Sequence, residues 1–160
     1  MHILFIGYGK TSQRVAKHLF EQGHHISTIS RSQKTDCYAT HYLQDIQQLD
    51  LAQLRPVDVV YVILAPSQSG IAAYQQTYVD SIEPIVEALK GHPVQRIIIV
   101  SSTRVYGENA GERIDDESMI QPIDEQGHLL RKMELLWQAY YPQQSIIVRP
   151  TGIYGTSIAR

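Results

Sequence analysis

Cysteine is almost missing from this sequence, since Cys37 is the only one among 160 residues. A single cysteine excludes a disulfide within the chain, and no motif around Cys37 marks it as a nucleophile. The sequence also has no apolar run long enough to span a membrane, and its start lacks the features of a signal peptide. We therefore expect a cytoplasmic protein in a reducing compartment, with no membrane partner.

The sequence also has no large excess of positive or negative charge. The 14 Lys and Arg residues nearly balance the 16 Asp and Glu residues, for a formal net charge of −2. Such a balance gives no general attraction to nucleic acid, so any anion site must be local. The seven histidines show no metal-ligand spacing, and we expect no metal site. The 43% hydrophobic content is enough for one globular domain with its own core.

The strongest local signal is the segment 3–12, where an apolar strand leads into two closely spaced glycines and then a helix. Gly7 allows a tight turn, Gly9 lets the backbone approach a phosphate, and the helix points free N–H groups at the anion. Ser12 replaces the third glycine of the usual fingerprint, and we expect it to keep the helix near the strand and to donate a hydrogen bond to phosphate. The alternative is a plain strand-to-helix turn. We predict a dinucleotide pyrophosphate site at Gly7, Gly9, Lys10, Thr11 and Ser12.

Strands and helices alternate along the chain. The expected strands cover residues 2–6, 25–30, about 39–43, 57–64, 95–101 and 145–149. Two of them are nearly continuous apolar runs, as in a parallel sheet that is buried on both faces. Apolar spacing predicts a helix that stops at Gly23 and helices over 71–89 and 128–140, with an interruption near Glu83 because Pro84 follows it. This pattern predicts an α/β fold, a doubly wound parallel sheet of the Rossmann type with strand order 3-2-1-4-5-6.

The end of the second strand indicates the cofactor. An NAD site usually has an acidic residue there to hold the ribose 2′-hydroxyl, whereas a 2′-phosphate needs cations and hydroxyls. This sequence instead has Ser30, Arg31 and Ser32, with Lys34 close behind. Arg31 can bind a phosphate with two parallel hydrogen bonds. We therefore predict NADP as the cofactor in preference to NAD, with Ser30 and Arg31 in the site; the alternative is a solvated basic loop.

Three further motifs follow the fourth, fifth and sixth expected strands. They read Leu-Ala-Pro at 64–66, Ser-Ser-Thr-Arg-Val-Tyr-Gly at 101–107 and Arg-Pro-Thr-Gly-Ile-Tyr-Gly at 149–155. Over essentially its whole length the chain resembles the extended short-chain dehydrogenase/reductase family, in its NAD(P)-dependent epimerase/dehydratase group. The resemblance implies a nicotinamide cofactor and oxidoreduction of a sugar-like or other hydroxyl-bearing small-molecule substrate. It also implies cofactor contacts at Leu64, Ala65, Pro66, Ser101 and Pro150.

The catalytic residues of the family are only partly present. There, a Ser or Thr after the fifth strand acts with a downstream Tyr-x-x-x-Lys pair, and Ser102 matches the first of these positions. The family has a glutamate four residues after its lysine. If Glu134 corresponds to that glutamate, Leu130 stands at the lysine position and Gln126 at the tyrosine position. An amide has no usable pKa and leucine has no charge, so this proton-transfer pair is missing.

Other residues offer an alternative chemistry. Lys132 would need a tyrosine four residues earlier, but that position is His128. One interpretation is a rearranged dyad, with His128 as the acid/base and Tyr106 near Ser102. The other is that His128 is a surface histidine and Tyr106 a packed tyrosine. The asparagine that the family has in the preceding helix corresponds to Tyr78.

We expect residues 1–160 to form a single dinucleotide-binding domain without the family's C-terminal substrate region, which follows the last motif. Two functions remain open at this stage. One is an NADP-binding oxidoreductase of the epimerase/dehydratase type, or the cofactor domain of such an enzyme. The other is a non-catalytic NADP-binding sensor or partner-binding module. In the family the helices expected at 71–89 and 128–140 commonly build a dimer interface, so we expect a homodimer through them, unless they only cover the sheet.

Overall fold

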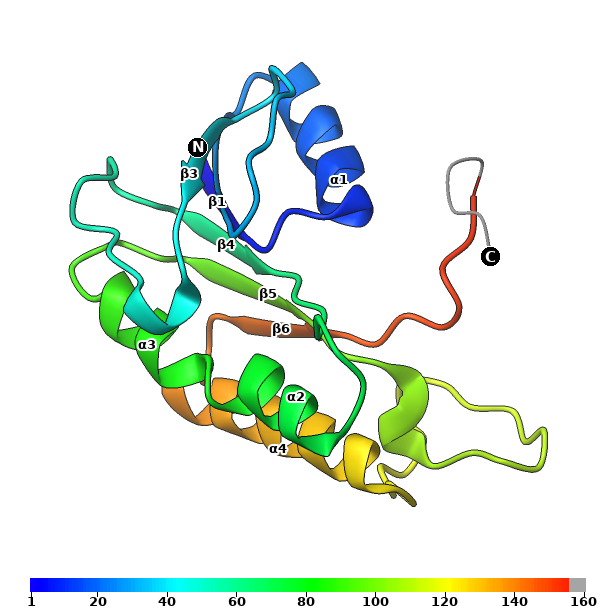
Figure 1. Ribbon diagram of the computed structural model, residues 1–160. Helices are drawn as coiled ribbons and strands as arrows, with labels where there is room; N and C mark the ends of the chain where they lie inside the picture. Colours follow the sequence, from blue (N-terminus) through cyan, green and yellow to red (C-terminus); the bar gives the residue numbers. More distant parts are fainter. Residues whose placement is uncertain (156–160) are drawn as a thin grey trace.

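Six parallel strands form one sheet in the computed structural model, which describes residues 1–155 (Figure 1). In chain order they are β1 His2–Ile6, β2 His25–Ser30, β3 Thr40–Leu43, β4 Val59–Val62, β5 Arg96–Val100 and β6 Ser145–Val148. Across the sheet the order is β3-β2-β1-β4-β5-β6, and every neighbouring pair is parallel. The doubly wound fold predicted from the sequence is confirmed, strand order included.

The strands β3, β4, β5 and β6 are shorter than predicted, and β4 differs most. Four residues of β4 pair with four of β1, from Ile3 opposite Val59 to Ile6 opposite Val62. The predicted strand 57–64 is therefore longer than the part of β1 with which it can pair. Its last residues pass into the loop at the carboxyl edge of the sheet, where the Ile63 amide still donates to the Ile6 carbonyl at 3.0 Å.

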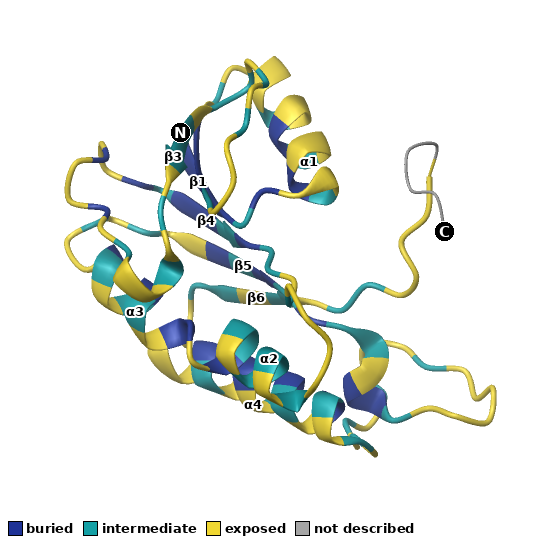
Figure 2. Cartoon of the chain, viewed as in Figure 1, coloured by how far each residue is buried: buried dark blue, intermediate teal, exposed yellow. Residues whose placement is uncertain are grey.

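The helices cover the two faces of the sheet unequally. Helix α1 (Lys10–Glu21) lies on one face, whereas α2 (Ile71–Tyr74), α3 (Ile82–Leu89) and α4 (Glu125–Tyr140) lie on the other (Figure 1). Figure 2 shows the buried residues along the central strands and on the sheet-facing sides of the helices. Within residues 1–155, no helix is both long and apolar enough to cross a lipid bilayer.

The long helix expected at 71–89 is interrupted, as predicted from Pro84. Helix α2 passes into a π-helical segment, Gln75–Val79, and α3 begins anew at Ile82. Pro84 thus lies in the first turn of α3, where its missing N–H costs no intrahelical hydrogen bond. The break falls a few residues before Glu83 because the helix widens first, with the Asp80 amide donating to the Gln75 carbonyl at 2.9 Å.

Helix α4 begins three residues earlier than predicted, at Glu125. Asp124 caps it, since its carboxylate accepts a hydrogen bond from the Gly127 amide at 2.7 Å. Gly127 is required here, because a Cβ atom would lie 3.0 Å from the Arg104 carbonyl oxygen and 2.9 Å from the Asp124 carboxylate. The start of α4 therefore packs closely on the segment that follows β5.

A buried carboxylate ties α4 to the ends of β5 and β6. Glu134 is fully buried and accepts hydrogen bonds from Ser101 Oγ at 2.7 Å, from Arg149 Nε and Nη2 at 2.9 Å each, and from Arg131 Nη1 at 2.9 Å. Arg149 also donates to the Tyr106 hydroxyl at 2.9 Å, and its guanidinium lies 5.2 Å from the centre of that ring. Every polar atom of Glu134 thus has a partner, which is the condition for burying a charge.

Loss of the Glu134 charge should destabilise the fold. Burial alone raises the pKa of Glu134, but the hydrogen bonds from Arg149, Ser101 and Arg131 outweigh burial and hold that pKa below its usual value. For Glu134→Gln we expect the free energy of unfolding at pH 7, measured by urea denaturation, to fall by about 3–5 kcal/mol, because Arg149 is left without its counter-ion. The matched control is Glu87→Gln at an exposed pair with Lys90, which should leave stability within experimental error.

The same lowered pKa sets a pH dependence. A carboxylate with a lower pKa in the folded state stabilises fully above its unfolded pKa, about 4.3, and loses that stabilisation as the pH falls further. The stability difference between the native chain and Glu134→Gln should therefore shrink below about pH 4. A difference that stays constant down to acid unfolding would contradict the ionised state of Glu134.

Candidate functional site

The glycine turn closes directly against the neighbouring strand end. Gly7 has φ +89°, and a Cβ atom on it would lie 2.0 Å from the Ile63 carbonyl oxygen. The Gly7 amide donates to the Ile29 carbonyl at 3.0 Å, so the turn also contacts the end of β2. Gly9 has an ordinary φ of −91° and open space where its Cβ would stand. Gly7 is therefore needed to build the turn, whereas Gly9 leaves its outer side open.

Ser12 closes the turn from within. Its side chain is buried, and its hydroxyl donates to the Gly7 carbonyl at 3.0 Å. Of the two roles expected for Ser12, this contact matches the one that holds the helix near the strand. At the start of α1, Gly9 supplies no side-chain cap and the first turn has no acidic residue. The first N–H groups of the helix thus remain suited to an external anion.

Two adjoining clefts run across the carboxyl edge of the sheet. The larger, of about 740 Å³, lies over the glycine turn and the ends of β1, β2 and β4. The smaller, of about 290 Å³, lies between the end of β4 and the helices α2 and α3. They share Arg31, Ile46, Leu64, Ala65 and Ser67. Because they share these residues, the two clefts form one elongated groove. A groove of this form suits a ligand that has two parts.

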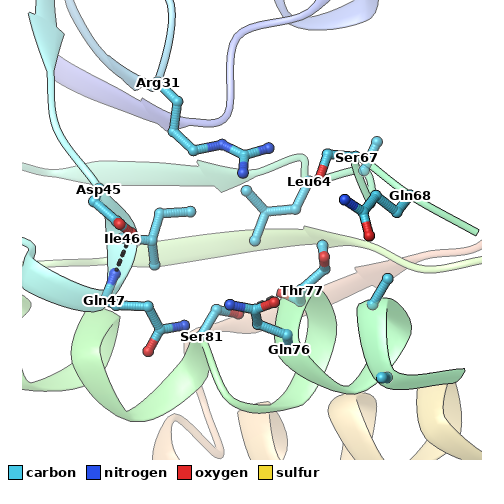
Figure 3. A pocket seen from close by; sticks show the side chains of 13 residues that line it. Arg31, Asp45, Ile46, Gln47, Leu64, Ser67, Gln68, Gln76, Thr77 and Ser81 are labelled. Carbon is cyan, nitrogen blue, oxygen red and sulfur yellow. Dashed lines mark hydrogen bonds between the residues drawn. The ribbon is translucent and has the colours of Figure 1, made fainter.

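The larger cleft is basic. Its described lining includes Lys10, Arg31 and Lys34 but no carboxylate. In the smaller cleft Arg31 extends toward Leu64, Ile46 lies on the side of Asp45, and Gln76 and Thr77 form the helical wall (Figure 3). Arg31 therefore stands where the two clefts meet.

Nine of the twelve predicted cofactor residues line the larger cleft. They are Gly7, Gly9, Lys10, Thr11, Ser12, Ser30, Arg31, Leu64 and Ala65. Pro66, Ser101 and Pro150 line neither of the two clefts. Ser101 is buried, and its hydroxyl donates to Glu134 as part of the ion-pair cluster.

The predicted catalytic position lies at the end of β5. Ser102 Oγ accepts a hydrogen bond from the Arg104 amide at 3.1 Å and so caps the short helical turn Thr103–Tyr106. Leu130, the residue expected at the family's lysine position, is 3% exposed and belongs to the core. Its apolar side chain therefore offers no cation to the groove.

The alternative dyad is not brought together by any described contact. The Tyr106 ring is buried and its hydroxyl is engaged by Arg149, while His128 is exposed on the first turn of α4. Tyr78, at the family's asparagine position, is partly buried, and burial raises its pKa. Among residues 1–155, no group of three or more potential ligands is placed to hold a metal ion.

Comparison with known proteins identifies the family. The model of the NAD dependent epimerase/dehydratase family matches residues 7–159. The chain belongs to this family. UDP-glucuronic acid 4-epimerase from Bacillus cereus, solved in complex with NAD, superposes with a TM-score of 0.82 at 22% identity, over 97% of this chain and 58% of that one.

Two further proteins also match this chain over only part of their own length. Protein YeeZ of Escherichia coli K12 is 29% identical over 107 residues, which make up 66% of this chain and 38% of YeeZ. UDP-N-acetylglucosamine 4-epimerase from Methanobrevibacter ruminantium superposes with a TM-score of 0.75 at 17% identity, over 92% of this chain and 54% of that one. The chain therefore spans between about two fifths and three fifths of the length of these proteins.

Some lining residues of the groove were not predicted from the sequence. Asp45 and Ile46 follow β3 after Gln44, and their position beyond the end of a strand of a parallel sheet was the available signal. Gln76, Thr77 and Ser81 come from the interrupted helix. No sequence pattern marks these three, because their direction depends on how the π-helical segment turns the backbone.

The two glycines of the turn give a matched pair of substitutions. Gly7→Ala should lower the free energy of unfolding by about 3 kcal/mol or more, because the new methyl group meets the Ile63 carbonyl and the positive φ is strained. Gly9→Ala should leave stability unchanged, since its backbone is unstrained and its surroundings are open. Urea denaturation of both variants checks this, and equal losses would contradict the geometry of the turn.

Proposed function

We propose that the groove binds a nicotinamide dinucleotide, with NADP preferred over NAD. The observation that supports this most directly is the lining of the larger cleft, which has three cations and no described carboxylate. A ribose 2′-phosphate requires such surroundings, whereas the 2′-hydroxyl of NAD is usually held by an acidic side chain. The Bacillus cereus relative was solved with NAD, so the preference for NADP is a property proposed for this chain.

The proposed ligand follows the groove from end to end. Its pyrophosphate faces Gly9, Lys10 and Thr11 at the start of α1, where the N–H groups and the helix dipole favour an anion. Its 2′-phosphate faces Arg31 and Lys34. Its adenine occupies the smaller cleft between Ile46 and Leu64, whose apolar surfaces suit a flat ring.

For chemistry, we propose that residues 1–160 form one cofactor domain of an epimerase/dehydratase-type protein that acts on sugar-like hydroxyl substrates. The relatives support the substrate class, since the Bacillus cereus enzyme was also solved with UDP-glucuronic acid and NAD. The bound cofactor would supply hydride transfer, and Ser102 would hydrogen-bond the reacting oxygen of the substrate. Pro66, Ser101 and Pro150 are not part of this proposal, because they lie outside the groove.

A second candidate function is a non-catalytic NADP sensor or partner-binding module. Leu130 favours it, because a core leucine at the lysine position cannot lower a tyrosine pKa or hold a ribose hydroxyl. A homodimer through α2, α3 and α4 is compatible with either function. The apolar side chains Leu135 and Tyr140 of α4 are 49% and 48% exposed and would lie in such an interface.

Cofactor preference is tested by calorimetric titration of the purified chain with NADPH and with NADH. We expect NADPH to bind more tightly, and Arg31→Ala to weaken NADPH about 10- to 100-fold, since a charge-assisted hydrogen bond contributes about 1.5–3 kcal/mol. NADH affinity should change less than about twofold. The matched control is Arg96→Ala, an exposed arginine at the amino end of β5. Failure of both nucleotides to bind, or equal loss for both with Arg31→Ala, would contradict the proposal.

Turnover separates the two candidate functions. NADP+ and UDP-glucose are incubated with the chain, the reduced nicotinamide is followed by its absorbance, and the sugar nucleotides are separated by chromatography, because an epimerase returns the hydride to the sugar and leaves no net reduction. Because the proton-transfer pair is missing, we expect saturable binding with neither net reduction nor a new sugar nucleotide, as for the sensor. Reduction or sugar conversion that is lost in Ser102→Ala would instead establish an enzyme whose acid/base lies outside the family pattern.

A further inference from the structure

The loop that carries the cationic end of the groove is fixed by one carboxylate. Residues 31–39 connect β2 to β3 without forming a helix or strand, and they pass beside α1 (Figure 1). Asp36 accepts hydrogen bonds from the Tyr8 hydroxyl at 3.2 Å, from the Tyr38 amide at 3.1 Å and from Gln13 Nε2 at 3.4 Å. This loop forms no strand pairing of its own, and the contacts of Asp36 connect it to the glycine turn and to α1.

The partners of Asp36 are themselves held in place. Tyr8 is 5% exposed and lies between the two glycines of the turn. Burial raises the pKa of Tyr8, and the Asp36 carboxylate raises it further, so the hydroxyl stays protonated and donates. His41 contacts Asp36 from the other side, with Nε2 3.1 Å from the Asp36 carbonyl and 3.4 Å from its carboxylate, and Nδ1 2.6 Å from the Thr28 hydroxyl on β2.

Asp36 is also the only acidic residue between Glu21 and Asp45. It is absent from the lining of the larger cleft, although Lys34, two residues earlier, is part of it. The contacts with Tyr8 and Gln13 therefore have two effects. They hold Arg31 and Lys34 over the cleft, and they keep the Asp36 carboxylate away from the place where a ribose 2′ group would lie.

We propose that Asp36 is a positioning residue for nucleotide selectivity, and that the Tyr8–Asp36 hydrogen bond sets the preference for a 2′-phosphate over a 2′-hydroxyl. The inference rests on the proposed dinucleotide function. A loop that is held in place before binding loses less conformational freedom when the phosphate arrives. A released Asp36 would repel the phosphate and would be able to accept a hydrogen bond from the 2′-hydroxyl instead.

The test is Tyr8→Phe, which removes the hydroxyl and changes neither charge nor ring. Titrations with NADPH and NADH give the ratio of their dissociation constants. We expect this ratio to shift toward NADH by about fivefold, the typical effect of one hydrogen bond. The matched control is Tyr38→Phe, which removes a hydroxyl from the same loop while the Asp36 contact of Tyr38 is made by its backbone amide. The ratio for this control should equal that of the native chain.

A double substitution shows whether the effect passes through the cationic loop. In an Arg31→Ala background, Tyr8→Phe should change the ratio by less than half of its effect in the native chain, because the positioned group has been removed. Asp36→Asn is the second variant, and we expect it to shift the ratio in the same direction. Equal weakening of both nucleotides by Tyr8→Phe would show a merely structural role and would overturn the proposal.

A measurement without nucleotide keeps this inference distinct from the proposed function. Amide hydrogen exchange of the free chain should become faster at residues 31–34 in Tyr8→Phe and remain unchanged in Tyr38→Phe. Unchanged exchange at 31–34 would overturn the positioning role, even if NADPH binds. If the native chain binds neither nucleotide while exchange responds as expected, the proposed function fails, and with it the selectivity role, although Asp36 still positions the loop.

Discussion

The close approach of Gly7 to the Ile63 carbonyl is the constraint on which the groove depends. At Gly7 the chain leaves β1, passes against the end of β4 and donates its amide hydrogen bond to the Ile29 carbonyl of β2. Only a residue without a side chain fits there. The helix α1, the ends of three neighbouring strands and the cationic loop thereby meet at one edge of the sheet. The larger cleft is formed between these elements.

A second constraint holds the opposite half of that edge. Glu134 joins α4 to the ends of β5 and β6 through Ser101 and Arg149, so the segment around Ser102 is anchored on both sides. Leu130, also on α4, packs in the core. The residue expected at the family's lysine position is therefore an apolar core residue, whereas the glycine turn and the cationic loop line a groove. For this reason nucleotide binding is the part of our proposed function with the most structural support.

The fold could be predicted well because two strands are nearly continuous apolar runs and strands alternate with helices along the chain, and Pro84 even indicated the helix break. It predicted less of the groove's second half. Asp45 and Ile46 follow a short strand that has no motif, and Gln76 and Thr77 depend on the π-helical turn before α3. Ser101 was assigned to the cofactor on the basis of the motif alone, whereas its hydroxyl is bonded to a residue 33 positions away. The contact of Tyr8 with Asp36 also joins residues far apart in sequence, so no local pattern reports it.

The central claim is that one groove, from the start of α1 to the smaller cleft, holds a dinucleotide. The most direct measurement is a nuclear magnetic resonance titration of the isotope-labelled chain with NADP+, in which each backbone amide is followed. Our account predicts saturable shifts at Gly9–Ser12, at residues 31–34 and at Asp45–Gln47, with little change along β6. Shifts confined to other surfaces, or none at saturating nucleotide, would contradict it.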